Sequence, residues 1–520
     1  MSAAEGGADS AGAGPVATPV QTMAVDLLVV GGGIAGLTAA YIGHQQGLSV
    51  LVCESARQVG GKVRSERRGD YLIECGPNSF LGSAKTIWRL ISQLNLEDQV
   101  VAGQPPGDRF IYRNRQARRL PKGLADLFRG DFMTLAGKLR LMAEPFQRGR
   151  AQVDDTVLAF ARRRLGPEAA QYLVSPFVSG IYAGDPAALG ARDSFPSLWN
   201  WEAKAGSIIL GALAGAFSRK PKDLEPPVPK RRGMFSFQQG FGALPKAMAQ
   251  ALPPGSARTH TSISALRLTQ PEDLAITGIS PQATPEHRYF AHGHVAAEPG
   301  HAPGDSGVQL QVFAKQVVLA LPPKGAATLL HALLPQAADR LQQVELCRVA
   351  VVHWGGPDPE HVAPQGFGLL VPPGEGLRTL GILMPSSVFA GRAPQGAFLH
   401  SAFLGGARDP DAVDLGDETL QQLAERAEQN AFGPLRQDRP LSRDFQTVVR
   451  WREAIPQYKV GHRQAMREVL DQVHAQLPGL TLAGNYLNGI SVNDAAQSGW
   501  DAISYLRRQG ALVAGPGGQP

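Results

Sequence analysis

Residues Ala24 to Glu54 read AVDLLVVGGGIAGLTAAYIGHQQGLSVLVCE. Leu27 to Val30 is a short apolar run, typical of a buried parallel strand, and glycines follow it at G-x-G-x-x-G spacing. A helix and a second apolar run from Leu48 to Cys53 come next, and the unit ends on an acid. The order strand, glycine turn, helix, strand and acid predicts an α/β protein with a Rossmann-like dinucleotide site.

Each glycine of the turn has a physical task in such a site. Gly31 permits the tight turn, Gly33 lets the backbone approach a pyrophosphate, and Gly36 lets the helix pack closely on the strand. The helix N-terminus then offers free N–H groups and its positive dipole end to the phosphates. Glu54 stands where an acid can accept hydrogen bonds from ribose hydroxyls, which favours NAD or FAD over NADP.

The segment after Glu54 distinguishes flavin from nicotinamide. Arg57 to Arg64 reads RQVGGKVR, a second glycine pair directly after the acidic strand end. This extension resembles the FAD-binding amine oxidase and desaturase superfamily. The resemblance makes FAD the expected cofactor.

Composition agrees with an ordinary globular protein. A chain of 520 residues, with 43% hydrophobic and 18% charged residues, is long enough for two or three domains and is neither disordered nor fibrous. Cys53, Cys75 and Cys347 are too few and too scattered for a disulfide framework or a zinc site, so reduced thiols and no metal are expected. The sequence contains no apolar run long enough to span a bilayer.

Residues 1–23 are rich in Ala, Gly, Ser and Pro and contain no basic residue. They lack the Arg-rich character of a transit peptide and the apolar core of a signal peptide. We therefore expect disordered tails at 1–23 and 509–520 and a cytoplasmic bacterial protein, with an organellar location as the alternative.

Basic residues gather in the region 105–230, although the formal net charge of the chain is only +6. The basic residues are Arg109, Arg113, Arg115, Arg118, Arg119, Lys122, Arg129, Lys138, Arg140, Arg148, Arg150, Arg162, Arg163 and Arg164. They form either a solvated basic face or a surface attracted to anionic lipid. Ser207 to Phe217, SIILGALAGAF, is apolar but too short to span a membrane. Peripheral contact with the inner membrane is expected, and nucleic acid is not, because no recognition motif accompanies the charge.

The rest of the chain suggests a FAD-binding domain in three parts, 24–104, 231–330 with an extended hairpin, and 451–508. A helical, membrane-associating insert with substrate contacts is expected at 105–230. Alternating apolar runs predict an antiparallel or mixed-sheet substrate domain at 331–450.

Near the C-terminus, Leu482 to Ala502 reads as a strand, a glycine loop and a helix. Ser491 with Asp494 three residues later is a variant of the capping box, which predicts a helix N-terminus there. This second positive dipole end would suit the anionic side of a reduced flavin ring, and an ordinary capped helix is the alternative.

Several longer motifs closely resemble the oxygen-dependent protoporphyrinogen oxidase family. The most specific are SPFVSGIYAGDP from Ser175, WREAIPQYKVGH from Trp451 and AGNYLNGISVNDAAQSG from Ala483. The resemblance implies a flavin-dependent, six-electron oxidation of protoporphyrinogen IX to protoporphyrin IX, in which O₂ is consumed and H₂O₂ released. It places the protein in haem or chlorophyll biosynthesis.

By this resemblance, FAD is held by segments from both ends of the chain. The implied cofactor residues are Gly31, Gly32, Gly33, Ile34, Ala35, Gly36, Glu54, Ser55, Gly61, Lys62, Gly76, Pro77, Asn78, Ser79, Ile263, Trp451, Gly484, Asn485, Ile490, Ser491 and Val492. Many members carry arginine where Lys62 stands, and lysine keeps the charge but loses the bidentate geometry.

The implied porphyrinogen-binding residues are Arg109, Gly368, Leu369, Leu370 and Met384. Arg109 matches an arginine that pairs with a substrate propionate, and a surface role is the alternative. Met384 stands where plant members carry a stacking phenylalanine, so apolar contact remains without ring stacking. No side chain is assigned as a catalytic acid or base, because the cofactor carries the redox step.

Other functions stay open from the sequence. Coproporphyrinogen III oxidation to coproporphyrin III needs the same flavin chemistry. An amine oxidase or carotenoid desaturase shares only the glycine motifs, and a non-catalytic binding protein on the same fold would have lost the flavin. The oligomeric state is not determined, and a homodimer is one option.

Overall fold

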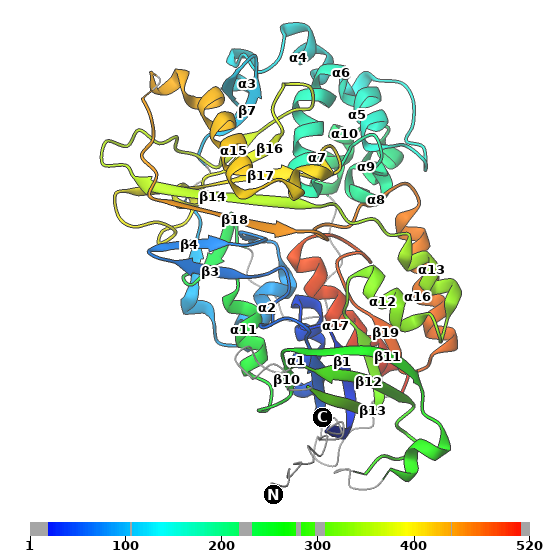
Figure 1. The fold of residues 1–520 in the computed structure, drawn as a ribbon. Helices are drawn as coiled ribbons and strands as arrows, with labels where there is room; N and C mark the ends of the chain where they lie inside the picture. The colour runs from blue at the N-terminus through cyan, green and yellow to red at the C-terminus, as the bar shows by residue number, and fades with distance from the viewer. Residues whose placement is uncertain are drawn as a thin grey trace, which may run out of the picture.

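The structure, a computed structural model, describes residues 19–104, 107–217, 231–276, 282–296, 307–437 and 439–510. These residues form two large sheets, which lie one above the other in Figure 1, and a helical region beside the upper sheet. The lower half combines blue, green and red segments, so it is built from the beginning, the middle and the end of the chain (Figure 1).

The lower sheet is the predicted Rossmann-like sheet. Its strand order is β10-β2-β1-β13-β12-β11, with β19 paired to β13. The strands are β1 (Val20–Val30), β2 (Val50–Cys53), β10 (Ala257–Arg258), β11 (Thr261–Leu268), β12 (Tyr289–Val295), β13 (Val308–Leu319) and β19 (Leu480–Leu482). β1, β2, β10, β13 and β19 pair in parallel, and β12 and β11 extend the sheet in antiparallel pairing. β2 and residues 27–30 of β1 are apolar and buried, as strands covered on both faces must be.

Helices cover both faces of this sheet. One face packs against α1 (Ile34–Gln45), α2 (Lys85–Gln93), α11 (Ala243–Gln250) and α17 (Val492–Arg508). The other face packs against α12 (Pro323–Leu330), α13 (Pro335–Gln342) and α16 (His462–Gln476). α17 approaches α1 closely because residue 499 is glycine: a Cβ there would lie 2.1 Å from the carbonyl oxygen of Ala35.

The upper sheet is the predicted antiparallel or mixed sheet. Its order is β18-β14-β17-β16-β15-β7-β8, and only β15 and β7 pair in parallel. The strands are β7 (Arg109–Arg113), β8 (Gln116–Arg119), β14 (Val349–Pro357), β15 (Gly368–Leu370), β16 (Thr379–Leu383), β17 (Ala397–Gly405) and β18 (Phe445–Trp451). α15 (Asp417–Phe432) covers one face with an apolar stripe, and α14 (Pro385–Val388) follows β16.

Small sheets join the two halves. β3 (Ser65–Arg68) pairs with β4 (Tyr71–Glu74), and β9 (Met234–Phe237) pairs with β5 (Phe80–Leu81) and β6 (Val100–Ala102).

The helical region follows β8 and ends before β9. Its helices are α3 (Leu124–Arg129), α4 (Leu135–Met142), α5 (Val157–Leu165), α6 (Pro167–Ala169), α7 (Ser175–Tyr182), α8 (Ala191–Ser194), α9 (Pro196–Ala205) and α10 (Ile208–Phe217), with a π-helical turn at Ala170–Val174. A buried ion pair between Arg164 and Glu144 holds α5 to the start of α10, where Glu144 accepts the N–H of Ile208 at 2.9 Å.

The structure differs from the sequence predictions at some element boundaries. β1 begins at Val20, so the tail predicted over residues 1–23 is wrong for its last residues; residues 1–18 lie outside the described ones. The region predicted as a helical insert begins with β7 and β8, which join the upper sheet because their apolar residues, among them Phe110, pack under α15. The loop parts of the predicted hairpin, 277–281 and 297–306, also lie outside the described residues.

Candidate functional site

The glycine loop leads directly from β1 into α1. Gly31 has a φ of 105°, and a Cβ there would lie 2.5 Å from the carbonyl oxygen of Ala320, so this turn requires glycine. A Cβ on Gly33 would meet no atom within 4 Å. Gly33 is also the N-cap of α1, and no side chain caps this helix. Open space beside uncapped helix N–H groups fits a phosphate of a dinucleotide.

Glu54 lies beside this loop, as the sequence predicts. The N–H groups of Gly32 and Ala56 donate to its carboxylate oxygens, each at 2.8 Å. The N–H of Thr261 donates to the backbone carbonyl of Glu54 at 2.8 Å, so β11 begins beside Glu54. Ile263, a predicted cofactor residue, is the third residue of β11. Glu54 is partly exposed and can accept from ribose hydroxyls at this edge.

The second glycine pair packs on the first loop, backbone against backbone. The N–H of Gly60 donates to the carbonyl of Gly32 at 2.7 Å, and a Cβ on Gly61 would lie 3.2 Å from the Cα of Gly33. A Cβ on Gly76 would lie 2.2 Å from the carbonyl oxygen of Lys62. Three segments thus approach one another where only glycine fits, and the resulting cradle fits FAD.

The C-terminal segment completes this edge. Leu482 of β19 pairs with Leu319 of β13, which pairs with Val30 of β1, so the loops after all three parallel strands leave the sheet together. The predicted capping box is confirmed: Ser491 Oγ accepts the N–H of Asp494 at 3.1 Å, and the Asp494 carboxylate accepts the N–H of Ser491. The first and last parts of the chain therefore meet at one edge of the sheet, and nucleotides bind at the carboxyl ends of such strands.

Lys62 is the cation closest in sequence to the second glycine pair. Its side chain is partly buried, and burial lowers the pKa of its ammonium group, against the opposing effect of the nearby Glu453 carboxylate and Cys347. Cys347 belongs to an apolar cluster with Val351 and Leu380, on the face of the upper sheet that Trp451 also contacts. Lys62 thus lies where the two halves of the protein meet.

A buried polar network that sequence reasoning missed supports the Gly76–Ser79 segment. Glu74 accepts from Ser65 Oγ at 2.5 Å and pairs with Arg392 at 3.1 Å, and burial raises the pKa of Glu74 to about 7. Arg392 also donates to Ser236 Oγ at 2.6 Å, and that hydroxyl donates to the carbonyl of Asn78 at 3.1 Å. The sequence signal that could have revealed this network is Glu74, a charged residue inside the apolar run YLIEC at residues 71–75.

Trp451, another predicted cofactor residue, lies next to the same segment. Its indole N–H donates to the carbonyl of Cys75 at 2.6 Å, and the Arg64 guanidinium lies 5.4 Å from the centre of its ring. Trp451 is the last residue of β18, so its hydrogen bond links the upper sheet to the segment that follows β4.

The predicted substrate residues come together at one end of the upper sheet. Gly368 pairs with Arg109 on β7 and with Leu383 on β16, and the N–H of Met384 donates to the carbonyl of Phe367 at 3.2 Å. The side chain of Arg109 is exposed and lies 5.2 Å from the centre of the Phe367 ring. These segments are far apart in sequence, and the strand pairing alone joins them.

Their side chains do not share one face. Leu369 and Met384 are 2% and 0% exposed, and both belong to the core under α15. Leu370 is only half-buried and faces α7, where a Cβ on Gly180 would lie 2.8 Å from its Cδ2. On β15 the structure therefore places Leu370 against the helical region and Leu369 inside the core, because successive side chains of a strand point to opposite faces. Met384, which follows β16, lies in the same core as Leu369.

The sequence matches the family described as flavin containing amine oxidoreductase over residues 34–502. Mitochondrial protoporphyrinogen oxidase of Nicotiana tabacum is 30% identical, over 92% of this chain and 94% of its own length. Protoporphyrinogen oxidase of Homo sapiens is 32% identical over 92% and 97% of the two chains. Coproporphyrinogen III oxidase of Bacillus subtilis (strain 168) is 26% identical over 92% and 98%.

Solved structures share the fold. A provisionally assigned protoporphyrinogen oxidase from an Exiguobacterium species has a TM-score of 0.74 at 22% identity, covering 94% of this chain and 100% of its own. Cyclohexylamine oxidase from Brevibacterium oxydans has a TM-score of 0.62 at 16% identity, with the same coverage. The fold, the glycine cradle and the sequence match agree: the chain belongs to the flavin-containing amine oxidoreductase family and is an FAD-dependent oxidoreductase related to the protoporphyrinogen oxidases.

Proposed function

We propose that the protein oxidises protoporphyrinogen IX to protoporphyrin IX, with O₂ as the electron acceptor and H₂O₂ as the product. The observation that carries the proposal is the extent of the similarity to protoporphyrinogen oxidases. It covers 92% of the chain, including the upper sheet as well as the FAD-binding segments. Amine oxidases, in contrast, are similar in fold at much lower identity.

The residues of the chain bind and orient the substrate in this proposal. FAD, when bound, would supply the redox chemistry, which is hydride acceptance and reoxidation by O₂. The exposed guanidinium of Arg109 suits a propionate, with which it can form a bidentate, charge-assisted pair. Apolar side chains such as Leu370 and Leu380 exclude water from the macrocycle. Pyrrole N–H protons can leave to solvent, so positioning is the main task of the protein.

The test is an anaerobic mixture of the purified yellow holoenzyme with protoporphyrinogen IX, started by adding air. The expected result is porphyrin fluorescence that rises together with O₂ uptake. Arg109→Ala should raise KM about tenfold with little change in kcat, because one charge-assisted pair is lost. A flavin-loaded enzyme that produces no porphyrin above the rate of autoxidation would refute the proposal.

Coproporphyrinogen III is the second candidate substrate, because a relative named for this activity matches over 92% of the chain. The two substrates differ in carboxylate number, so kcat/KM measured for both under the same conditions distinguishes them. A higher value for coproporphyrinogen III would reassign the protein. A non-catalytic binding protein would instead be purified without flavin absorbance.

We also propose peripheral membrane contact through the helical region. Large apolar side chains are exposed there, including Leu135 at 63% and Phe146 at 84%. The others are Phe128, Leu139, Met142, Val153, Phe177, Ile181, Ile209, Leu210 and Leu213. None of the described helices is long and apolar enough to cross a bilayer. Apolar side chains gathered on short helices are typical of an interfacial segment.

The basic residues contribute less to this surface than the sequence predicts. Arg164 is fully buried against Glu144, Arg113 pairs with Glu168 at 2.9 Å, and Lys122 pairs with Asp108 at 2.8 Å. Flotation with neutral and anionic vesicles separates the apolar from the electrostatic contribution. Phe146→Ser should reduce binding to both kinds of vesicle, and recovery of the wild-type protein solely in the soluble fraction would count against membrane contact. A homodimer is a separate proposal that light scattering can test.

A further inference from the structure

Tyr458 and His462 stack on each other beside the C-terminal flavin loop, defined here as residues 484–491. Their ring centres are 4.1 Å apart, with an angle of 25° between the planes. The Tyr458 hydroxyl donates to the carbonyl of Asn485 at 2.7 Å, and His462 Nε2 lies 2.7 Å from the carbonyl oxygen of Tyr486. Because a carbonyl can only accept, Nε2 carries the proton in this bond.

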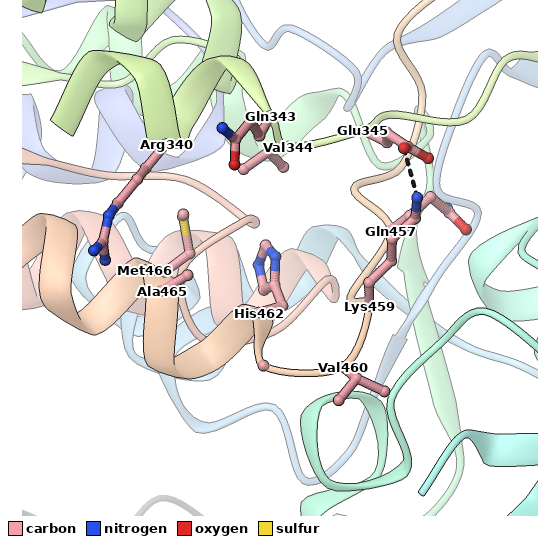
Figure 2. Close-up of a pocket in the computed structure, with 11 residues that line it drawn as sticks. Arg340, Gln343, Val344, Glu345, Gln457, Lys459, Val460, His462, Ala465 and Met466 are labelled. Atoms are coloured by element: carbon pink, nitrogen blue, oxygen red, sulfur yellow. Dashed lines mark hydrogen bonds and ion pairs between the residues drawn. The ribbon is translucent and has the colours of Figure 1, made fainter. Parts of the chain in front are cut away.

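The pair is buried although both rings are polar. Tyr458 is 0% and His462 8% exposed. Burial lowers the pKa of His462, which favours the neutral ring with its single proton on Nε2. Figure 2 shows His462 at the start of α16, in a pocket of about 300 Å³ that Val344, Lys459 and Met466 also line. The imidazole thus borders this pocket, and its Nε2 side faces the loop.

The helical region holds the pair from its other side. The carboxylate of Asp193 accepts the N–H groups of Gly461 at 3.0 Å and Arg463 at 2.7 Å, which fixes the first turn of α16. The N–H of Gly190 donates to the carbonyl of Tyr458 at 2.9 Å. The pair thus lies between the helical region and the flavin loop, with hydrogen bonds to both.

We propose that Tyr458 and His462 are positioning residues for FAD, acting through the flavin loop. In a trans peptide the C=O and the N–H point in opposite directions. By binding the carbonyl of Asn485, Tyr458 turns the N–H of Tyr486, on the other side of the same peptide, toward the cofactor edge. His462 fixes the next carbonyl, that of Tyr486, while the N–H of Leu487 closes the loop on the carbonyl of Gly484 at 3.3 Å. The proposal needs only FAD binding and does not depend on which porphyrinogen is the substrate.

The test compares FAD retention and flavin potential in the purified holoenzyme and its variants. Tyr458→Phe removes one hydrogen bond to the loop and keeps the ring, so the dissociation constant for FAD should rise about fivefold. His462→Leu should weaken FAD binding further. His462→Gln places an amide N–H near the position of Nε2 and should restore part of the affinity. The midpoint potential of bound FAD and its visible spectrum should shift in Tyr458→Phe and His462→Leu.

Tyr289→Phe is the matched control. The Tyr289 hydroxyl, on a 1% exposed side chain, also donates to a backbone carbonyl, that of Pro478 at 2.8 Å, but outside the flavin loop. This variant should lower the thermal stability of the protein as much as Tyr458→Phe does, with unchanged FAD affinity and potential. Equal FAD affinity and potential in both Tyr variants would overturn the proposal. Should His462→Leu fail to fold, Tyr458→Phe and His462→Gln still decide it.

Discussion

The N-termini of α1 and α17 lie at the same edge of the lower sheet but are completed in opposite ways. α1 begins at Gly33 with no side-chain cap and no acidic residue in its first turn. α17 begins with a full capping box, and its first turn contains Asp494. The first helix leaves its N–H groups for a ligand, whereas the second satisfies its own. The carboxylate of Asp494 also offsets the positive end of its helix, so α17 acts more through its position than through its dipole.

The largest expected effect comes from adding a side chain inside the glycine turn before α1. In Gly36→Ala the new Cβ would lie 2.0 Å from the carbonyl oxygen of Gly31, which is backbone and cannot move aside. We expect a loss of about 3 kcal/mol in the free energy of unfolding and a protein without flavin. Denaturant unfolding and the ratio of flavin to protein absorbance measure both. A yellow protein of normal stability would show that the α1 turn is less constrained than its contacts indicate.

Gly33→Ala should separate ligand binding from folding at the same helix end. Gly33 has a φ of −74°, which alanine adopts freely, and a Cβ would find open space there. The methyl group would occupy the space expected for the pyrophosphate, so FAD affinity should fall by at least about tenfold while the stability of the FAD-free protein stays normal. Calorimetric titration with FAD measures the change. Unchanged affinity would mean that the phosphates lie elsewhere.

The smallest effect is expected at α17. Ser491→Ala removes the hydroxyl that accepts the N–H of Asp494 and should cost about 1 kcal/mol of stability. FAD affinity should fall only about twofold, since the helix keeps its place against α1. Thr156→Ala is the control, because Thr156 caps α5 in the same way in the helical region. If Ser491→Ala lost FAD as completely as Gly33→Ala, the contrast between the two helix ends would fail.

Local patterns predicted the parts of the site that depend on neighbours in sequence. The spacing of Gly31, Gly33 and Gly36, the acid after β2 and the capping box at Ser491 are all confirmed in place. Strand alternation also predicted the upper sheet. It could not tell which face of that sheet meets a ligand, because both faces are covered, and so Met384 lies in the core under α15.

The amino-acid sequence alone was enough for the dinucleotide turn and its helix, because sterics and hydrogen bonds within a few residues decide them. Tertiary structure decided what long-range contacts control. It paired Arg109 with Gly368, buried Arg164 against Glu144, and set Tyr458 and His462 on the carbonyls of the flavin loop. No local pattern encodes such contacts, since each forms only when strands and helices distant in the chain pack together.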